Sequence, residues 1–172
     1  MAAIYNLSRP WGRSHQYKEG RMPNQPHSKD LRKGRYSEAN RIYHITTTTF
    51  DRQPWFKDFE CARIVVKKMK QEQKKAQTLA YVLMPDHLHW LLQLQQNADI
   101  SNVVKIIKTL SALEINRHLK RKGALWQPGF HDHALRNEED IQGIARYIVA
   151  NPLRAGIAEK IGDYPLWDAV WI

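Results

Sequence analysis

The stretch YVLMPDHLHWLLQL, residues 81–94, is the part of the chain that decides the fold. Two apolar runs flank Pro85 and Asp86 within it. Proline cannot donate a ladder hydrogen bond and favours a tight turn, so the two runs are predicted to pair as a β-hairpin. Alternate residues of a strand point to the same face of a sheet, so His87 and His89 should project side by side.

The segments on either side of this hairpin predict a mixed order of strands and helices. A β-branched and aromatic run at 41–50 predicts a strand, and apolar residues at helical spacing predict amphipathic helices over 55–76 and 99–123. A short, broken strand is expected within 125–136 and a third helix over 137–151. The order matches the split β-α-β arrangement. The predicted fold class is therefore α+β: a ferredoxin-like antiparallel sheet with helices on one face, followed by a C-terminal helix.

Local signals predict where the later helices begin and end. Ser101 is the expected N-cap of the second helix and Gly123 its end. Asn137 is the expected N-cap of the third helix, which Asn151 and Pro152 should stop. The residues that follow are expected to form a packed C-terminal tail.

The positive charge of the chain is large and unevenly distributed. Its 172 residues contain 27 Lys and Arg against 17 Asp and Glu, a net charge of +10. Residues 1–41 carry nine basic against three acidic residues, 57–75 carry seven against three, and 105–122 carry six against one. The net charges of these three segments are +6, +4 and +5. Residues 123–172 carry four basic against seven acidic residues, a net charge of −3. Such a localised positive field favours a nucleic-acid partner, and the alternative is solvated helix faces plus a basic tail.

Composition also limits the class of protein. The single cysteine, Cys61, excludes a disulfide framework and a thiolate zinc cluster, and it fits a reducing cytosol. No apolar run approaches the roughly 20 residues that a membrane-spanning helix needs, and the N-terminus has no apolar signal-peptide region, so a cytoplasmic protein without a membrane partner is expected. Residues 1–36 are polar, basic and rich in proline, which predicts a flexible basic arm and leaves 37–172 as the folded domain.

His87 and His89 are the first candidates for chemistry. Each ring needs a hydrogen-bond partner if it is buried, and a bound metal ion supplies one partner to both. Two nitrogens leave the coordination shell incomplete, so further ligands would have to come from elsewhere in the chain, from substrate or from water. The alternative is a pair of hydrogen-bonded histidines on a partly exposed strand.

The predicted third helix carries two further candidates, Tyr147 and Asn151. At about 100° per residue, the core-facing stripe of this helix consists of Ile141, Ile144, Ala145 and Ile148. Tyr147 and Asn151 lie one turn apart on the flank of that stripe, where they can overlook a site on the sheet. Taken alone, each residue is better explained by a structural role: Tyr147 as a boundary tyrosine with a packed ring, and Asn151 as a helix C-cap before proline.

Four blocks of sequence together resemble a known family. Two histidines separated by a hydrophobic residue on a strand, with a tyrosine on a later helix, resemble the HUH single-tyrosine transposases, and most closely the REP-associated tyrosine transposases. The blocks that carry the resemblance are LRKGRYSEANRIYHIT (31–46), YVLMPDHLHWLL (81–92), LWQPGFHDHALRNEEDI (125–141) and ARYIVANPLRAGI (145–157). The resemblance runs over about residues 31–170, in the same order along the chain.

The resemblance implies a role for each candidate. His87 and His89 match the metal ligands, Asn151 matches the third ligand, and Tyr147 matches the nucleophile. The ion would be Mg²⁺ or Mn²⁺, and the reaction would cleave and rejoin DNA at palindromic, REP-type hairpins through a covalent 5′-phosphotyrosine. The ester keeps the bond energy, so rejoining needs no ATP, and the chain has no P-loop motif. No general base for Tyr147 is apparent.

The implied partner is single-stranded or hairpin DNA, bound in the bacterial cytoplasm at the nucleoid by a monomer or a homodimer. Basic side chains of the arm would contact phosphates, and His131 or His133 would contact DNA or orient a ligand. The alternative for the arm is a solvated tail without a partner, and the alternative for His131 and His133 is a position on an edge strand exposed to water. The candidate DNA-contacting residues are Lys29, Arg32, Lys33, Arg35, His131, His133 and Arg154.

Two other functions compete with the transposase. The first is a non-catalytic nucleic-acid-binding module with a ferredoxin-like, RNA-recognition-type sheet, in which His87, His89 and Tyr147 only bind or pack. The absence of an RNP1-like block counts against it. The second is a metal-dependent nuclease that uses water as the nucleophile, with Tyr147 in a structural role.

Overall fold

The computed structural model of the protein describes residues 37–136 and 140–171. The predicted arm, 1–36, lies outside the described residues, as does Asn137, the predicted N-cap. The four arm residues predicted to contact DNA therefore also lie outside them: Lys29, Arg32, Lys33 and Arg35.

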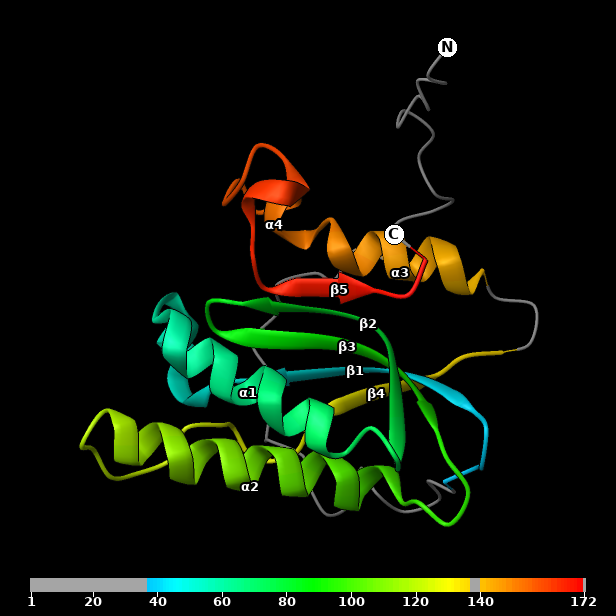
Figure 1. Ribbon diagram of the computed structural model, residues 1–172, viewed down its shortest axis with the longest axis horizontal. Helices are drawn as coiled ribbons and strands as arrows, with labels where there is room; N and C mark the ends of the chain where they lie inside the picture. Colours follow the sequence, from blue (N-terminus) through cyan, green and yellow to red (C-terminus); the bar gives the residue numbers. More distant parts are fainter. Residues whose placement is uncertain (1–36, 137–139, 172) are drawn as a thin grey trace, which may run out of the picture. The chain divides into compact units, whose positions relative to one another are not determined.

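The described chain builds one five-stranded sheet in the order β4-β1-β3-β2-β5, and every neighbouring pair is antiparallel (Figure 1). Because β1 and β2 both pair antiparallel with β3, they run parallel to each other with β3 between them, in agreement with the predicted split β-α-β arrangement. The strands are β1 Ile42–Thr48, β2 Ala76–Met84, β3 His87–Leu94, β4 His131–Ala134 and β5 Trp167–Ala169.

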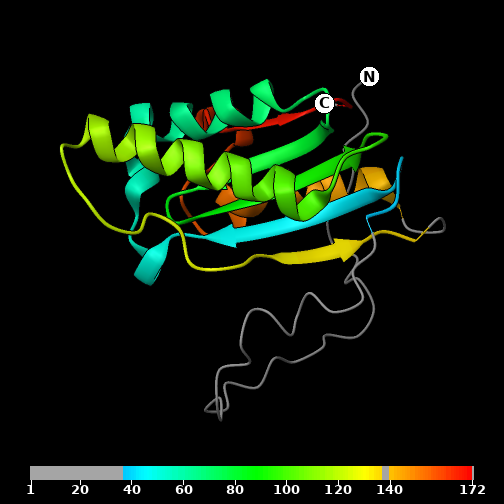
Figure 2. The same ribbon diagram turned by 90° about the horizontal axis from the view of Figure 1, so that it is seen from below.

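Helices cover both faces of this sheet. Figure 2 shows α1 and α2 side by side over one face and α3 behind the other. The predicted placement of helices on one face holds for the first two helices, and α3 covers the opposite face. Among the described residues, no helix is both long and apolar enough to cross a membrane. The α-helices are α1 Phe59–Gln71, α2 Ile100–His118, α3 Ile141–Val149 and α4 Asn151–Arg154, and the 3₁₀ turns are η2 Phe50–Arg52, η3 Trp55–Lys57 and η4 Ile161–Asp163.

The core lies between the sheet and the α1–α2 layer. Leu88, Trp90 and Leu92 alternate along β3 and are at most 1% exposed. Burying each such leucine contributes about 1.5–3 kcal/mol, so this face fixes the register of β3. The indole N–H of Trp90 donates to the Thr78 hydroxyl at 3.0 Å, so the polar atom of this buried ring is satisfied.

Several predicted helix ends differ from the structure. Asp99, and not Ser101, caps α2, because its carboxylate accepts the backbone N–H three residues later. Asp140 caps α3 in the same way. The second helix ends at His118, so Gly123, which has a φ of +112°, lies in the loop beyond it and does not end the helix.

The chain after α3 is more regular than predicted. The third helix, α3, ends at Val149, directly before the predicted stop at Asn151 and Pro152. A short helix, α4, then begins at Asn151, because Pro152 lies in its first turn, where its missing N–H needs no partner. The predicted packed tail contains β5, which pairs with β2. The hydroxyl of Tyr164 donates to the backbone carbonyl of Leu83 at 2.6 Å and ties the tail to the sheet.

Candidate active site

His87 and His89 lie on the face of the sheet turned away from α1. Tyr81 of β2 borders a cavity together with Met69 of α1, so its side chain faces α1. Tyr81 is paired with Trp90 of β3, and paired residues point to the same face, so Trp90 also faces α1. The histidines alternate with Trp90 along β3 and therefore face the other way. Their ring centroids are 4.9 Å apart, with the planes at 85°. The predicted pairing of the two rings on one strand face is correct.

His87 has one ring nitrogen committed and one free. Its Nδ1 lies 2.6 Å from a carboxylate oxygen of Asp86, and the other oxygen of Asp86 lies 3.2 Å from the guanidinium of Arg52. Partial burial opposes ionisation of Asp86, but its contacts with His87 and Arg52 outweigh this and lower its pKa. The carboxylate therefore holds Nδ1–H, and the Nε2 atom of His87 has no hydrogen bond to any described residue.

His89 is held in a similar way by neutral groups. Its Nδ1 lies 3.1 Å from the Thr46 hydroxyl and 3.3 Å from Nε2 of His44. Burial lowers the pKa of His89 to about 3, and the charges of His87, His44 and Arg154 act in the same direction. The ring is therefore neutral at physiological pH. Its Nε2 atom has no hydrogen-bond partner in the described part of the chain.

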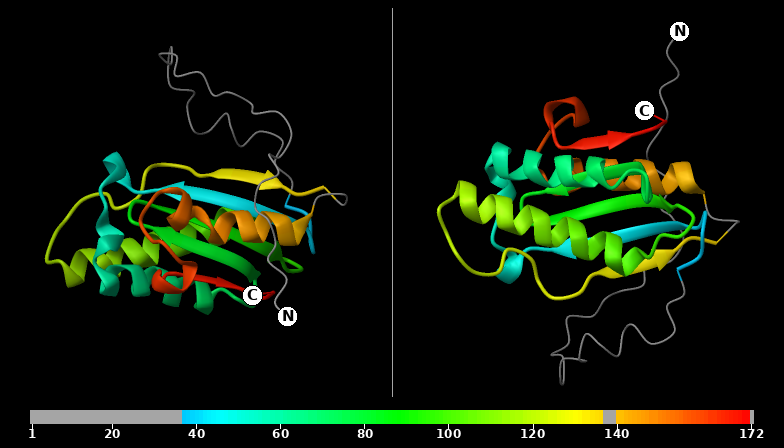
Figure 3. Two further views of the ribbon diagram at one scale, coloured as in Figure 1. Left: turned by 90° about the horizontal axis from the view of Figure 1, so that it is seen from above. Right: turned by 60° about the horizontal axis from the view of Figure 1, so that its bottom comes forward.

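The helix that carries Tyr147 packs on this same face. Ala145 and Ile148 of α3 are at most 1% exposed, and α3 contacts β2, β3 and β5; Figure 3, left, shows α3 lying across the sheet. Tyr147 is 53% exposed on the flank of the helix, as its spacing predicts. The guanidinium carbon of Arg154 lies 4.1 Å from the centroid of the Tyr147 ring. The charge of the same guanidinium is one of the smaller causes of the lowered pKa of His89.

Asn151 has its amide oriented by α3. Its Nδ2 donates to the backbone carbonyls of Tyr147, at 3.2 Å, and Ile148, at 2.9 Å. These two carbonyls can only accept, so they fix which end of the amide is nitrogen. The Oδ1 atom of Asn151 is left out of both bonds. The side chain thus acts as a helix cap and keeps an oxygen available as a ligand.

The donor atoms without a hydrogen bond to a described residue are of the kinds that divalent cations bind. They are the two Nε2 atoms of His87 and His89 and the Oδ1 atom of Asn151. Nitrogen and oxygen donors of this kind suit Mn²⁺ or Mg²⁺ when the remaining positions are filled by water or phosphate oxygen. Both ring Nδ1 atoms already have protein partners, which is the arrangement that metal-binding histidines usually show.

His131 and His133 lie on β4, at the edge of the sheet. His131 pairs with Thr46 and His133 pairs with His44, so both share the face of the candidate site. Both side chains are exposed. Burial lowers the pKa of His44, and the charge of His133, its partner across β1 and β4, lowers it further.

Residues 37–151 match the family model described as "Transposase IS200 like". The chain belongs to the IS200-like transposase family. A REP-associated tyrosine transposase of Escherichia coli K12 is 28% identical over 108 residues, which cover 62% of this chain and 62% of the relative. A Haemophilus influenzae protein named for the same type of transposase is 30% identical over 99 residues, 52% of this chain and 56% of its own length. The chain thus spans less than two thirds of either relative.

A solved structure agrees with this transposase fold. It is the structure of a REP-associated tyrosine transposase bound to a REP hairpin, with a TM-score of 0.63 and 26% sequence identity. The likeness covers 77% of this chain and 79% of the other. The predicted relationship to the REP-associated tyrosine transposases is confirmed.

Sequence reasoning missed three residues of the candidate site in this transposase: His44, Thr46 and Asp86. His44 and Thr46 flank Ile45 in β1, so the strand period could have placed them on one face, but only the register of β1 against β3 brings them to His89. Asp86 directly precedes His87 in the sequence, but its position after Pro85 predicts only a turn residue.

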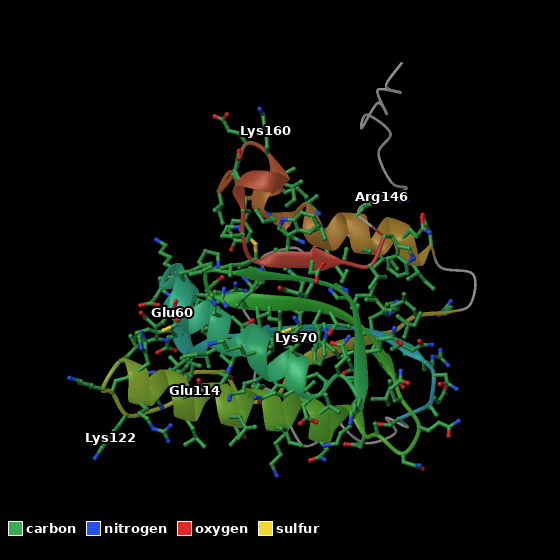
Figure 4. The ribbon with its side chains drawn as sticks, viewed as in Figure 1. Glu60, Lys70, Glu114, Lys122, Arg146 and Lys160 are labelled. Carbon is green, nitrogen blue, oxygen red and sulfur yellow. The ribbon has the colours of Figure 1, made fainter. Side chains whose placement is uncertain are left out.

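Part of the predicted basic surface lies away from the site. Figure 4 labels Lys70 on α1 and Lys122 after α2 in the helical layer, together with the acidic side chains of Glu60 and Glu114. Residues 57–75 and 105–122, with net charges of +4 and +5, both belong to this layer. The sheet separates these charges from the histidine pair.

Proposed function

We propose that this transposase is a metal-dependent endonuclease and strand transferase that cleaves and rejoins single-stranded DNA at palindromic hairpins through a covalent bond to Tyr147. The observation that carries the proposal is the open Nε2 atoms of His87 and His89 on the face of the sheet that the tyrosine-bearing helix covers. The relative of known structure binds a REP hairpin, which supports REP-type hairpins as the substrate class.

The proposed reaction assigns one role to each side chain. His87, His89 and Asn151 hold Mg²⁺ or Mn²⁺, which when bound supplies Lewis-acid polarisation of the scissile phosphate. The Tyr147 oxygen loses its proton and attacks phosphorus, the bond to the 3′ oxygen breaks, and that oxygen takes a proton. The products are a 5′-phosphotyrosine and a free 3′-hydroxyl, and attack by a 3′-hydroxyl reverses the step.

Arg154 suits the electrostatic part of this reaction. Its guanidinium stacks on the Tyr147 ring, so it can contact a phosphate that Tyr147 attacks, and its positive charge also acts on His89. Arginine presents a planar set of donors that matches phosphate oxygens. His131 and His133 extend the same face towards β4, and we assign them to contacts with the DNA strand. The basic side chains of the arm contribute further phosphate contacts.

A gel assay tests the nucleophile. The full chain is incubated with Mn²⁺ and a hairpin DNA that carries a single-stranded flank labelled on the 3′ side of the cleavage site, then resolved under denaturing conditions. We expect a covalent protein–DNA adduct that EDTA prevents and that Tyr147→Phe abolishes. Tyr81→Phe is the matched control, because Tyr81 lies on the opposite face of the sheet and its variant should form the adduct normally.

Other outcomes would select the competing functions. Cleavage that survives Tyr147→Phe without an adduct would refute the nucleophile and indicate a hydrolytic nuclease. Hairpin binding without cleavage, unchanged by EDTA, would indicate a non-catalytic nucleic-acid-binding module.

A further inference from the structure

The turn between β2 and β3 is anchored to the loop that follows β1. The backbone N–H of Thr49 donates to the carbonyl of Asp86 at 2.8 Å. The Thr49 hydroxyl has a single proton and lies between two carbonyls, that of Gln53 at 2.8 Å and that of Asp86 at 3.0 Å. The N–H of Phe56 donates to the carbonyl of Pro85 at 3.0 Å. Thr49 is fully buried. These bonds involve the backbone of Asp86 and leave its carboxylate for other partners.

That carboxylate bridges Arg52 and His87. One oxygen lies 2.6 Å from Nδ1 of His87 and the other 3.2 Å from Arg52. Arg52 reaches it from a turn in which Asp51 and Arg52 have φ values of +50° and +51°. Two consecutive non-glycine residues in the left-handed region are unfavourable, and such conformations persist where the surrounding structure holds them.

The two histidines differ in the charge of their Nδ1 partners. His87 faces a carboxylate, whereas His89 faces the Thr46 hydroxyl and the His44 ring. A carboxylate that accepts Nδ1–H fixes the tautomer and orientation of an imidazole and strengthens Nε2 as a donor to a metal. The site therefore contains one histidine with an ionic support and one with neutral supports.

We propose that Asp86, held by Arg52, is a positioning residue that keeps the proton of His87 on Nδ1 and so directs its Nε2 lone pair to the divalent cation. This inference rests on the proposed function, because it takes His87 as a metal ligand. Asp86 does not touch the DNA or the cation, and acts through His87 alone.

Two measurements on the full chain test this role. The first is ¹⁵N NMR of the metal-free protein, which reports which nitrogen of His87 carries the proton, with His87→Gln used to assign the signal. The second is the Mn²⁺ dissociation constant from calorimetry. The variants are Asp86→Ala, Asp86→Asn and Arg52→Gln, and Asp168→Asn is the control for loss of an exposed carboxylate far from the pair.

We expect His87 to carry its proton on Nδ1 in the unaltered protein and to become a mixture of tautomers in Asp86→Ala. Loss of such a support typically weakens metal binding by about 10- to 100-fold, so Asp86→Ala should raise the Mn²⁺ dissociation constant by that factor. Asp86→Asn should have a smaller effect because its amide oxygen still accepts Nδ1–H. Arg52→Gln should raise the constant by a few fold at most, because the Arg52 side chain is exposed and acts only through Asp86. Asp168→Asn should leave it unchanged.

The result separates this inference from the proposed function. If the unaltered chain binds no Mn²⁺, both are overturned. If it binds Mn²⁺ and Asp86→Ala binds it equally well, or if His87 carries its proton on Nε2, only the role of Asp86 is overturned.

Discussion

Asn151 combines two roles in one side chain, and substitution can separate them. Its Nδ2 donates to two carbonyls at the end of α3, and its Oδ1 is the proposed third ligand. Alanine at this position removes both roles. Aspartate removes the two donated hydrogen bonds but keeps an oxygen ligand. We therefore expect Asn151→Ala and Asn151→Asp to have similar effects on stability and different effects on metal binding.

The size of the stability loss follows from the two hydrogen bonds, which are 3.2 and 2.9 Å long. Each contributes about 0.5–1.5 kcal/mol net, and because the Asn151 side chain is only half-buried, the lower part of that range applies. Asn151→Ala should therefore lower the free energy of unfolding by about 1–2 kcal/mol, or the melting temperature by roughly 2–8 °C. In Asn151→Asp the new negative charge is unfavourable at the C-terminal end of α3 but favourable at the N-terminal end of α4, so the two effects oppose each other and the loss of stability should be similar.

Metal affinity should rank the variants differently. Loss of a ligand should raise the Mn²⁺ dissociation constant of Asn151→Ala by at least about tenfold, whereas Asn151→Asp should bind as tightly as the unaltered chain or tighter. Thermal denaturation and calorimetric titration with Mn²⁺ measure the two quantities on the same preparations. If Asn151→Ala loses stability but binds Mn²⁺ unchanged, Asn151 is a helix cap only and its assignment as a ligand is refuted.

Three further predictions concern other contacts. Arg154→Lys keeps the charge but loses the planar group over the Tyr147 ring. Because Tyr147 is exposed, the cation–π energy is about 0.5–1 kcal/mol, so adduct formation on gel time courses should slow roughly two- to fivefold. An unchanged rate would count against the role of Arg154. Tyr164→Phe removes a buried hydrogen bond to the Leu83 carbonyl, so urea denaturation should show that the free energy of unfolding falls by about 1–1.5 kcal/mol. An unchanged free energy of unfolding would mean that this bond does not stabilise the packing of the tail on the sheet. Burial raises the pKa of Cys61 from 9.0 to about 11, so its stabilising contribution is complete below about pH 9 and is lost as the pH rises to 11. Between pH 9 and 11 the free energy of unfolding should fall less steeply with pH in Cys61→Ala than in the unaltered chain. Equal slopes in the two proteins would argue against a raised pKa of Cys61.

The features that the sequence predicts well are those set by a short period. Alternation along a strand places His87 and His89 on one face, and the helical period places Tyr147 and Asn151 on one flank. Both signals are contained in a few consecutive residues, so no tertiary contact is needed to find them. The split β-α-β order follows in the same way from the sequence of apolar patterns.

The features that the sequence did not predict depend on distant parts of the chain. His44 and Thr46 reach His89 only through the register of β1 against β3, which no local pattern specifies. The three residues of β5 form a strand because β2 offers an edge, and their own sequence is too short to signal it. Asp140 begins α3 in place of the predicted residue because an aspartate there reaches the amide of Gly143.

The position of β3 between β1 and β2 makes the candidate site sensitive to the length of a turn. A single residue inserted at Pro85 or Asp86 would slip the pairing by one and turn every side chain of β3 over. Leu88 would then meet α3, and the histidines would enter the apolar layer beneath α1 and α2. The motif would still be intact in an alignment, yet no site would form. In a relative with a longer or shorter turn, the two histidines by themselves therefore do not predict activity.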